Sequence, residues 1–120
     1  MKILIVDDSK AMRMIVQRTL RQAGFGDHDV TEAANGVEAM AALEQGGYDL
    51  VLSDWNMPQM SGIELLQTMR SKGLAAPFGF VTSEGTPPMR QAATDAGAIF
   101  LIAKPFTAEA FEQVLRPVLR

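Results

Sequence analysis

Five polar side chains stand out because each lies just after a short apolar run. The acid pair Asp7 and Asp8 follows the first such run and Asp54 the third, while Thr82 and Lys104 follow the fourth and fifth. Short apolar runs of this kind are typical of buried strands in a parallel sheet. Because ligands of such sheets bind beyond the carboxyl ends of the strands, we expect these side chains to share one pocket.

The chemistry of this set points to phosphoryl transfer. Three carboxylates in one pocket repel one another, so they must take up protons or hold a cation. Mg²⁺ suits them, because it prefers oxygen ligands and keeps several water molecules. Lys104 would add a fixed positive charge and Thr82 a hydroxyl hydrogen bond. A carboxylate in such surroundings can act as a nucleophile and form an acyl phosphate.

Taken singly, these residues have simpler explanations. Asp7 and Asp8 could cap a helix, and Asp54 could belong to an ordinary turn. Lys104 could be a solvated surface lysine. Their joint occurrence at the ends of four predicted strands is what favours a phosphoryl-transfer pocket.

The rest of the chain shows how this pocket would be built. Runs rich in Ile, Val, Leu and Phe predict strands at residues 3–6, 30–33, 50–52, 78–81 and 99–102. Apolar residues at helical spacing predict helices over residues 12–23, 37–43, 63–69, 89–96 and 111–118. The alternation indicates an α/β fold of the (βα)5 type, a doubly wound parallel sheet of five strands. The flavodoxin-like strand order 2-1-3-4-5 would place the three aspartates together.

Local signals predict how two of the helices begin. Asn35 is placed to cap the second helix, with Glu38 three residues on as in a capping box. Thr107 is placed to cap the fifth, with Phe106 and Phe111 at the spacing of a hydrophobic staple.

The composition excludes several other kinds of site. The chain has 120 residues, enough for one domain, and no cysteine, which rules out disulfides, Cys-zinc sites and cysteine nucleophiles. A net charge of −3 without a basic stripe argues against nucleic-acid binding. No apolar run approaches the length of a membrane span, and the early aspartates do not fit a signal peptide. We therefore expect a cytoplasmic protein that binds neither membranes nor nucleic acid.

Two longer motifs carry a resemblance to a known family. Asp54-Trp55-Asn56-Met57-Pro58 and Lys104-Pro105-Phe106-Thr107, together with the acid pair and Thr82, resemble the receiver domain of two-component response regulators. The similarity is greatest to single-domain chemotaxis regulators of the CheY type. It covers residues 1–120, so we expect a receiver domain without an output domain.

The resemblance implies a role for each residue of the pocket. Asp54 would accept a phosphoryl group from a sensor histidine kinase or a histidine phosphotransfer domain. Mg²⁺ would be bound by Asp8, Asp54, the backbone carbonyl of Asn56 and, mainly through water, Asp7. The phosphoryl group would contact Lys104, Thr82, Ser83, Asn56 and Met57. The Lys104–Pro105 peptide bond would be cis.

The resemblance also implies an output. Movement of Thr82 would change the surface of the fourth helix, fifth strand and fifth helix, and so control binding of an effector protein that the sequence does not identify. Asn56 and Glu84 occupy the positions that tune self-dephosphorylation in the family, and their identities predict a short-lived acyl phosphate. We expect a monomeric signalling protein rather than an enzyme.

Three positions depart from the family pattern. Leu101 stands where the family has an aromatic switch residue, and Phe100, one residue away, should face the other side of the sheet. Pro87-Pro88 should stiffen the loop after Thr82. Arg116-Pro117 interrupts the last predicted helix near its end.

Other functions remain open from the sequence. A phosphate sink or shuttle would use the same pocket without an effector, and Leu101 favours it. A phosphate-ester hydrolase would need an Asp-x-Asp motif after the first strand, where this chain has adjacent acids. A flavodoxin-like cofactor protein would share the sheet, but three carboxylates would repel a flavin phosphate.

Overall fold

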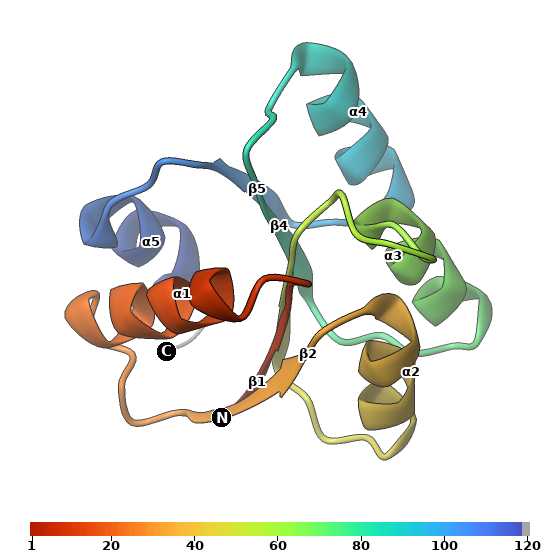
Figure 1. Ribbon diagram of the computed structural model, residues 1–120, viewed down its shortest axis with the longest axis horizontal. Helices are drawn as coiled ribbons and strands as arrows, with labels where there is room; N and C mark the ends of the chain where they lie inside the picture. Colours follow the sequence, from red (N-terminus) through yellow and green to blue (C-terminus); the bar gives the residue numbers. More distant parts are fainter. Residues whose placement is uncertain (119–120) are drawn as a thin grey trace.

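A parallel sheet with helices on both faces forms the molecule, as the computed structural model of residues 1–118 shows (Figure 1). Its strands are β1 (Lys2–Val6), β2 (Asp29–Ala33), β3 (Leu50–Ser53), β4 (Phe78–Thr82) and β5 (Phe100–Ala103). The helices are α1 (Lys10–Gln22), α2 (Gly36–Glu44), α3 (Gly62–Ser71), α4 (Pro87–Ala96) and α5 (Ala108–Leu115). The strand order is β2-β1-β3-β4-β5, which confirms the predicted fold class and topology.

The predicted fifth strand and the predicted last helix extend beyond the observed elements. The fifth strand begins at Phe100, so Ile99 lies before it with a half-exposed side chain. The last helix ends at Leu115, so Val118 is not helical. Pro117 explains this second difference: Arg116 still bonds the Glu112 carbonyl in helical geometry, but Pro117 has no N–H with which to continue the helical hydrogen bonds.

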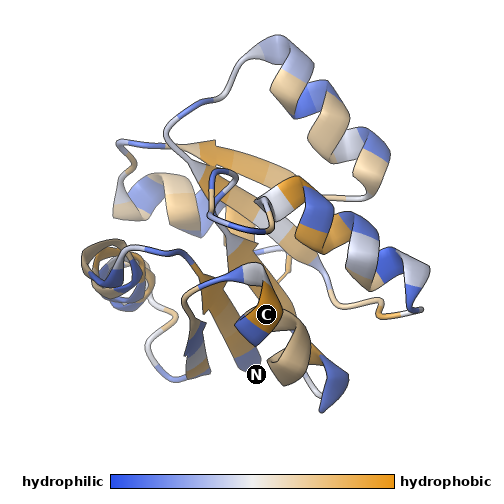
Figure 2. Cartoon of the chain, turned by 45° about the vertical axis from the view of Figure 1, so that its right-hand side comes forward, coloured by the Kyte–Doolittle hydropathy of each residue, from blue (hydrophilic) through white to orange (hydrophobic). Residues whose placement is uncertain are grey.

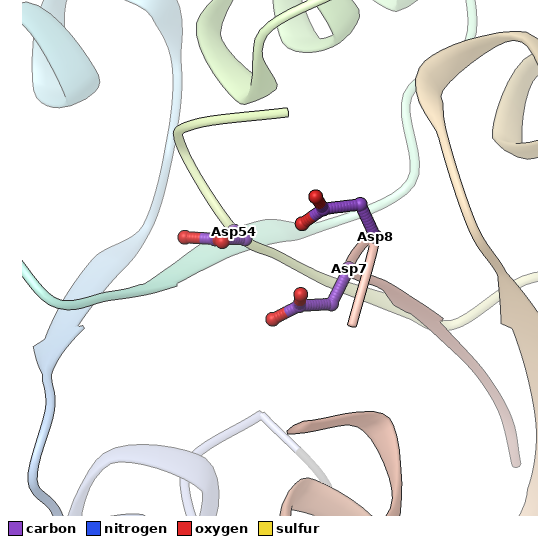
Figure 3. A group of neighbouring side chains, drawn as sticks. All are labelled: Asp7, Asp8 and Asp54. Carbon is purple, nitrogen blue, oxygen red and sulfur yellow. The ribbon is translucent and has the colours of Figure 1, made fainter. Parts of the chain in front are cut away.

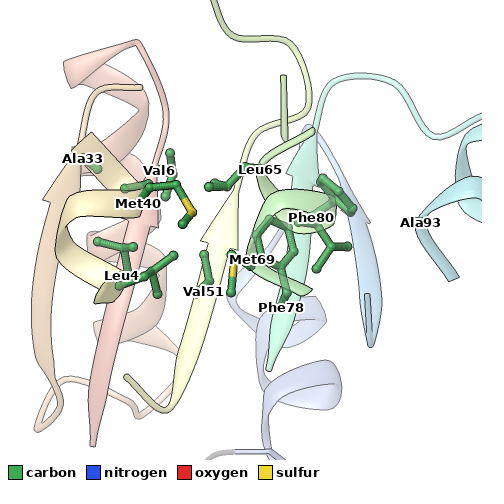
Figure 4. Close-up of a cluster of buried hydrophobic side chains, with 13 residues drawn as sticks. Leu4, Val6, Ala33, Met40, Val51, Leu65, Met69, Phe78, Phe80 and Ala93 are labelled. Atoms are coloured by element: carbon green, nitrogen blue, oxygen red, sulfur yellow. The ribbon is translucent and has the colours of Figure 1, made fainter. Parts of the chain in front are cut away.

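The period of two along each strand divides the core between the two faces of the sheet. In β1, Leu4 and Val6 point toward α2, α3 and α4, whereas Ile3 and Ile5 point toward α1 and α5. The first of these clusters includes Met69, Phe78 and Phe80 (Figure 4). In Figure 2 the sheet is mostly hydrophobic and the outer helices alternate hydrophobic and hydrophilic faces. Burial on both faces fixes the central strands, and so the positions of their carboxyl ends.

The side chains of Phe100 and Leu101 lie on opposite faces of the sheet because of the same alternation. Phe100 belongs to the cluster under α1 and α5, and Leu101 to the one under α2, α3 and α4. The Phe100 ring lies against Gly79, where an added β-carbon would come within 2.1 Å of it. Phe100 therefore faces away from Leu101, as predicted, and does not replace an aromatic residue at that position.

A polar side chain caps the start of each helix. The caps are Ser9, Asn35, Ser61, Thr86 and Thr107. The capping box predicted at Asn35 is only half formed, because Glu38 accepts from the Ala34 amide instead. The complete box joins Ser61 and Glu64 at α3. Phe106 and Phe111 stack with ring centres 4.7 Å apart, which confirms the predicted staple.

Within residues 1–118, no helix has the length and apolar character that crossing a membrane requires.

Candidate phosphoryl-transfer site

Three aspartates meet at the carboxyl ends of β1 and β3. These strands are neighbours, and their register pairs Val6 with Ser53, so the residues that follow are brought together. One carboxylate oxygen from each of Asp7, Asp8 and Asp54 lies within 4.8 Å of the others (Figure 3). Asp7 is 4% exposed, while Asp8 is open to solvent. The predicted convergence of the acids is therefore present in the structure.

Asp7 is held in place from several sides. Its amide donates to the Ala33 carbonyl at 3.1 Å, and its Oδ1 accepts from the Ser9 amide at 2.9 Å. Ser9, not an aspartate, caps α1 by accepting from the Met12 amide at 3.2 Å. The acid pair is thus not used as a helix cap, and both carboxylates are available to the pocket.

Lys104 faces the aspartates from the end of β5. Its Nζ lies 3.4 Å from Asp7 Oδ2 and 3.8 Å from Asp54 Oδ2, and its side chain is 16% exposed. One ammonium group opposes three carboxylates, so the pocket has an excess of negative charge. The Lys104–Pro105 peptide bond is cis, as the resemblance implies.

The Asp54 carboxyl is affected by burial and by the charges around it. Burial raises the pKa of Asp54 above its ordinary value, and the nearby charges of Asp7 and Asp8 raise it further, while Lys104 and a hydrogen bond from the Trp55 amide oppose this. The Trp55 amide donates to Oδ1 at 2.8 Å, and Oδ2 faces Lys104. Oδ1 is thus held by a hydrogen bond, and Oδ2 faces the Lys104 ammonium group, which would neutralise charge on a phosphoryl group.

Comparisons with known proteins show the family of the chain. A family model described as the response regulator receiver domain matches residues 3–116. The chain belongs to this family. It is 42% identical over 119 residues to chemotaxis protein CheY-3 of Vibrio cholerae, which covers 96% of this chain and 88% of that protein. It is 40% identical over 122 residues to chemotaxis protein CheY1 of Helicobacter pylori, covering 99% of this chain and 97% of that one.

Solved structures of receiver proteins have the same fold. The structure of Vibrio cholerae chemotaxis protein CheY4 matches with a TM-score of 0.86 at 35% identity, with 98% of both chains covered. The receiver domain described here is thus CheY-like in both sequence and fold.

The donor set of this receiver fits a divalent cation. Three carboxylates supply hard oxygen ligands, and the exposure of Asp8 leaves room for water beside them. A cation would also relieve the repulsion that Lys104 balances only in part.

The remaining predicted site residues differ in their burial. Thr82 is fully buried, and its hydroxyl accepts from the Glu84 amide at 3.4 Å. The side chains of Asn56 and Glu84 are exposed, and Met57 packs against the core. Beside Lys104 is a pocket of 430 Å³, lined by Met12, Ile15, Ser83, Lys104, Pro105 and Phe106.

Sequence reasoning missed several contacts around the site. Gly62 donates its amide to the Trp55 carbonyl at 2.7 Å and closes the loop that follows Asp54. Arg90 of α4 donates to the Gly85 carbonyl at 3.1 Å and the Leu101 carbonyl at 3.3 Å. The Ser-x-x-Glu pattern of Ser61 and Glu64 signals that α3 begins at Gly62, but it does not indicate the partner of the Gly62 amide. No sequence pattern marked the second, because it joins a helix to the edge of the sheet.

Proposed function

We propose that this receiver domain accepts a phosphoryl group on Asp54, from a sensor histidine kinase or a histidine phosphotransfer domain, in a Mg²⁺-dependent reaction. The observation that carries the proposal is the convergence of Asp7, Asp8 and Asp54 opposite Lys104. The acids supply a nucleophile and cation ligands, and the lysine supplies a fixed countercharge.

The transfer forms one bond and breaks one. Oδ2 of Asp54 attacks the phosphorus of a phosphohistidine, and the P–N bond breaks as the new P–O bond forms. The histidine nitrogen leaves with the electron pair and takes a proton from solvent. Lys104 neutralises charge on the phosphoryl oxygens, and the Trp55 amide keeps the attacking carboxylate oriented.

The other residues have supporting roles. Mg²⁺, when bound, supplies positive charge beside the transferring group. Its protein ligands would be Asp7, Asp8, Asp54 and the Asn56 carbonyl. The phosphoryl group would be held by Lys104, Thr82, Ser83 and the amides of Asn56 and Met57. Asn56 and Glu84 are both exposed, and we assign to them control of the lifetime of the acyl phosphate, which we expect to be short.

The proposed output is a changed surface. Thr82 would exchange its bond with the Glu84 amide for one to the phosphoryl group, which would move the loop before α4 and alter the α4-β5-α5 face. The partner there is an effector protein, with chemotaxis as the proposed pathway.

The pocket of 430 Å³ beside Lys104 would receive an apolar side chain of the phosphodonor protein. We place the protein in the cytoplasm, as a monomer.

Leu101 supports a second candidate, a phosphate sink or shuttle. It lies on the face toward α4, where an aliphatic side chain offers no ring to couple Thr82 to an effector. Effector binding that does not change on phosphorylation would favour this candidate.

The test is the intact mass of the protein after incubation with acetyl phosphate. We expect the wild type to gain one phosphoryl group only with Mg²⁺, and Asp54→Asn to gain none. Because the adduct is short-lived, beryllofluoride binding followed by Trp55 fluorescence provides a second readout. Failure of both measurements would contradict the proposal.

A further inference from the structure

We infer that Arg13 is a positioning residue for the Mg²⁺ site, acting through the peptide group that joins Asp7 to Asp8. The inference rests on the proposed function, because it concerns the ion used there. Arg13 lies at the end of the first turn of α1 and its side chain is only 13% exposed. Arg13 is not one of the residues that carry the family resemblance, and it is not a member of the acid cluster.

The contacts of Arg13 cross from α1 to the end of β1 and the edge of the sheet. Its Nη1 donates to the carbonyl oxygen of Asp7 at 2.6 Å. Its Nε donates to Oε1 of Glu32 on β2 at 2.9 Å. Glu32 is 41% exposed, so it fixes the direction of the guanidinium more than it adds stability. The rigid fork of an arginine makes both bonds at once.

The bond to the Asp7 carbonyl matters because a peptide group is planar. Fixing this oxygen fixes the plane that contains the α-carbons of both aspartates, and with it the direction in which Asp8 leaves the chain. Asp7 has further bonds to Ala33, Ser9 and Lys104. Within residues 1–118, the Asp8 carboxylate makes no hydrogen bond or ion pair, so its position depends on the backbone.

Positioning and charge predict opposite effects when Arg13 is removed. Loss of a positive charge near three carboxylates would by itself strengthen cation binding. Loss of the bond that orients the Asp8 backbone would weaken it, and groups that orient metal ligands typically contribute about 10-fold or more in affinity. We expect the second effect to dominate, so Arg13→Gln should bind Mg²⁺ about 10-fold more weakly.

The experiment is a Mg²⁺ titration of the intact protein, followed by Trp55 fluorescence and by the rise in the urea midpoint that Mg²⁺ causes. Arg18→Gln is the charge-matched control, since Arg18 is exposed on the same helix. Arg13→Lys should recover part of the affinity, because it can donate to the Asp7 carbonyl but lacks the fork. Glu32→Gln should cause a smaller loss than Arg13→Gln.

The outcomes separate the inference from the proposed function. A weaker site in Arg13→Gln, with Arg18→Gln unchanged, supports the positioning role. Equal or tighter Mg²⁺ binding by Arg13→Gln would overturn it, even if the variant were less stable to urea. Absence of Mg²⁺ binding by the wild type would overturn the proposed function and this inference together.

Discussion

Replacing Gly62 by alanine should displace Asp54, the proposed phosphoacceptor. Gly62 opens α3, and a β-carbon there would lie 2.1 Å from the carbonyl oxygen of Asp54 and 2.9 Å from the Phe80 ring. Ordinary contacts of a β-carbon begin at 3.4 Å, and the obstructing atom belongs to the backbone rather than to a flexible side chain. The main chain at Asp54 must therefore move.

The magnitude follows from this overlap. A shift of roughly 1 Å in a reacting group can cost about 100-fold in rate. Overpacking of this kind also lowers the free energy of unfolding by about 1–3 kcal/mol. Gly62→Ala should therefore remain folded but react with acetyl phosphate and Mg²⁺ about 100-fold more slowly than wild type.

The matched control is Gly79→Ala. Its β-carbon would come equally close, at 2.1 Å, to the ring of Phe100, which belongs to the cluster under α1 and α5. This variant should lose stability in urea, by less than Gly62→Ala because the Phe100 ring is a side chain that can shift. It should keep most of its phosphorylation rate, which Trp55 fluorescence follows. Wild-type rate and stability in Gly62→Ala would refute the reasoning, as would equal rate losses in both variants.

Three further predictions follow from the charges and contacts of the site. Because the pKa of Asp54 is raised, ionisation of this carboxyl lowers the stability of the folded protein at neutral pH. Asp54→Asn should therefore raise the urea midpoint at neutral pH without Mg²⁺. The gain should vanish at acid pH, where the Asp54 carboxyl is protonated in both the folded and the unfolded protein. Lys104→Met should slow phosphorylation about 100-fold yet tighten Mg²⁺ binding, and weaker Mg²⁺ binding would contradict the charge argument. Arg90→Met should release the loop before α4, because it removes the hydrogen bonds to the Gly85 and Leu101 carbonyls. A hydrogen-bond contribution of about 1 kcal/mol corresponds to amide hydrogen exchange about fivefold faster at residues 83–86. Unchanged exchange would show that these contacts do not restrain the loop.

The acid cluster could be predicted because it depends on strand ends alone. Once residues 3–6 and 50–52 are read as neighbouring parallel strands, Asp7 and Asp54 must meet at one edge. The opposite facing of Phe100 and Leu101 follows from the period of two in a strand, and the structure confirms it. These features need only the order of the strands and the direction of the chain.

Contacts that depend on exact register could not be predicted. The bond from Arg13 to Glu32 requires that Glu32 stand opposite Ile5, which the composition of a half-exposed edge strand does not specify. Glu38 was expected to close a capping box with Asn35, but it bonds the amide one residue earlier. Local sequence patterns indicated that these side chains could form hydrogen bonds, but tertiary packing determined which neighbouring group each of them binds.

The most direct test of the central claim is to locate the acyl phosphate. Borohydride reduces an acyl phosphate to an alcohol, so reduction after incubation with acetyl phosphate and Mg²⁺ marks the phosphorylated aspartate in a peptide map. We predict the mark on Asp54 alone, and its absence without Mg²⁺. A mark on Asp7 or Asp8, or no mark although beryllofluoride binds, would contradict the assignment of Asp54 as the phosphoacceptor.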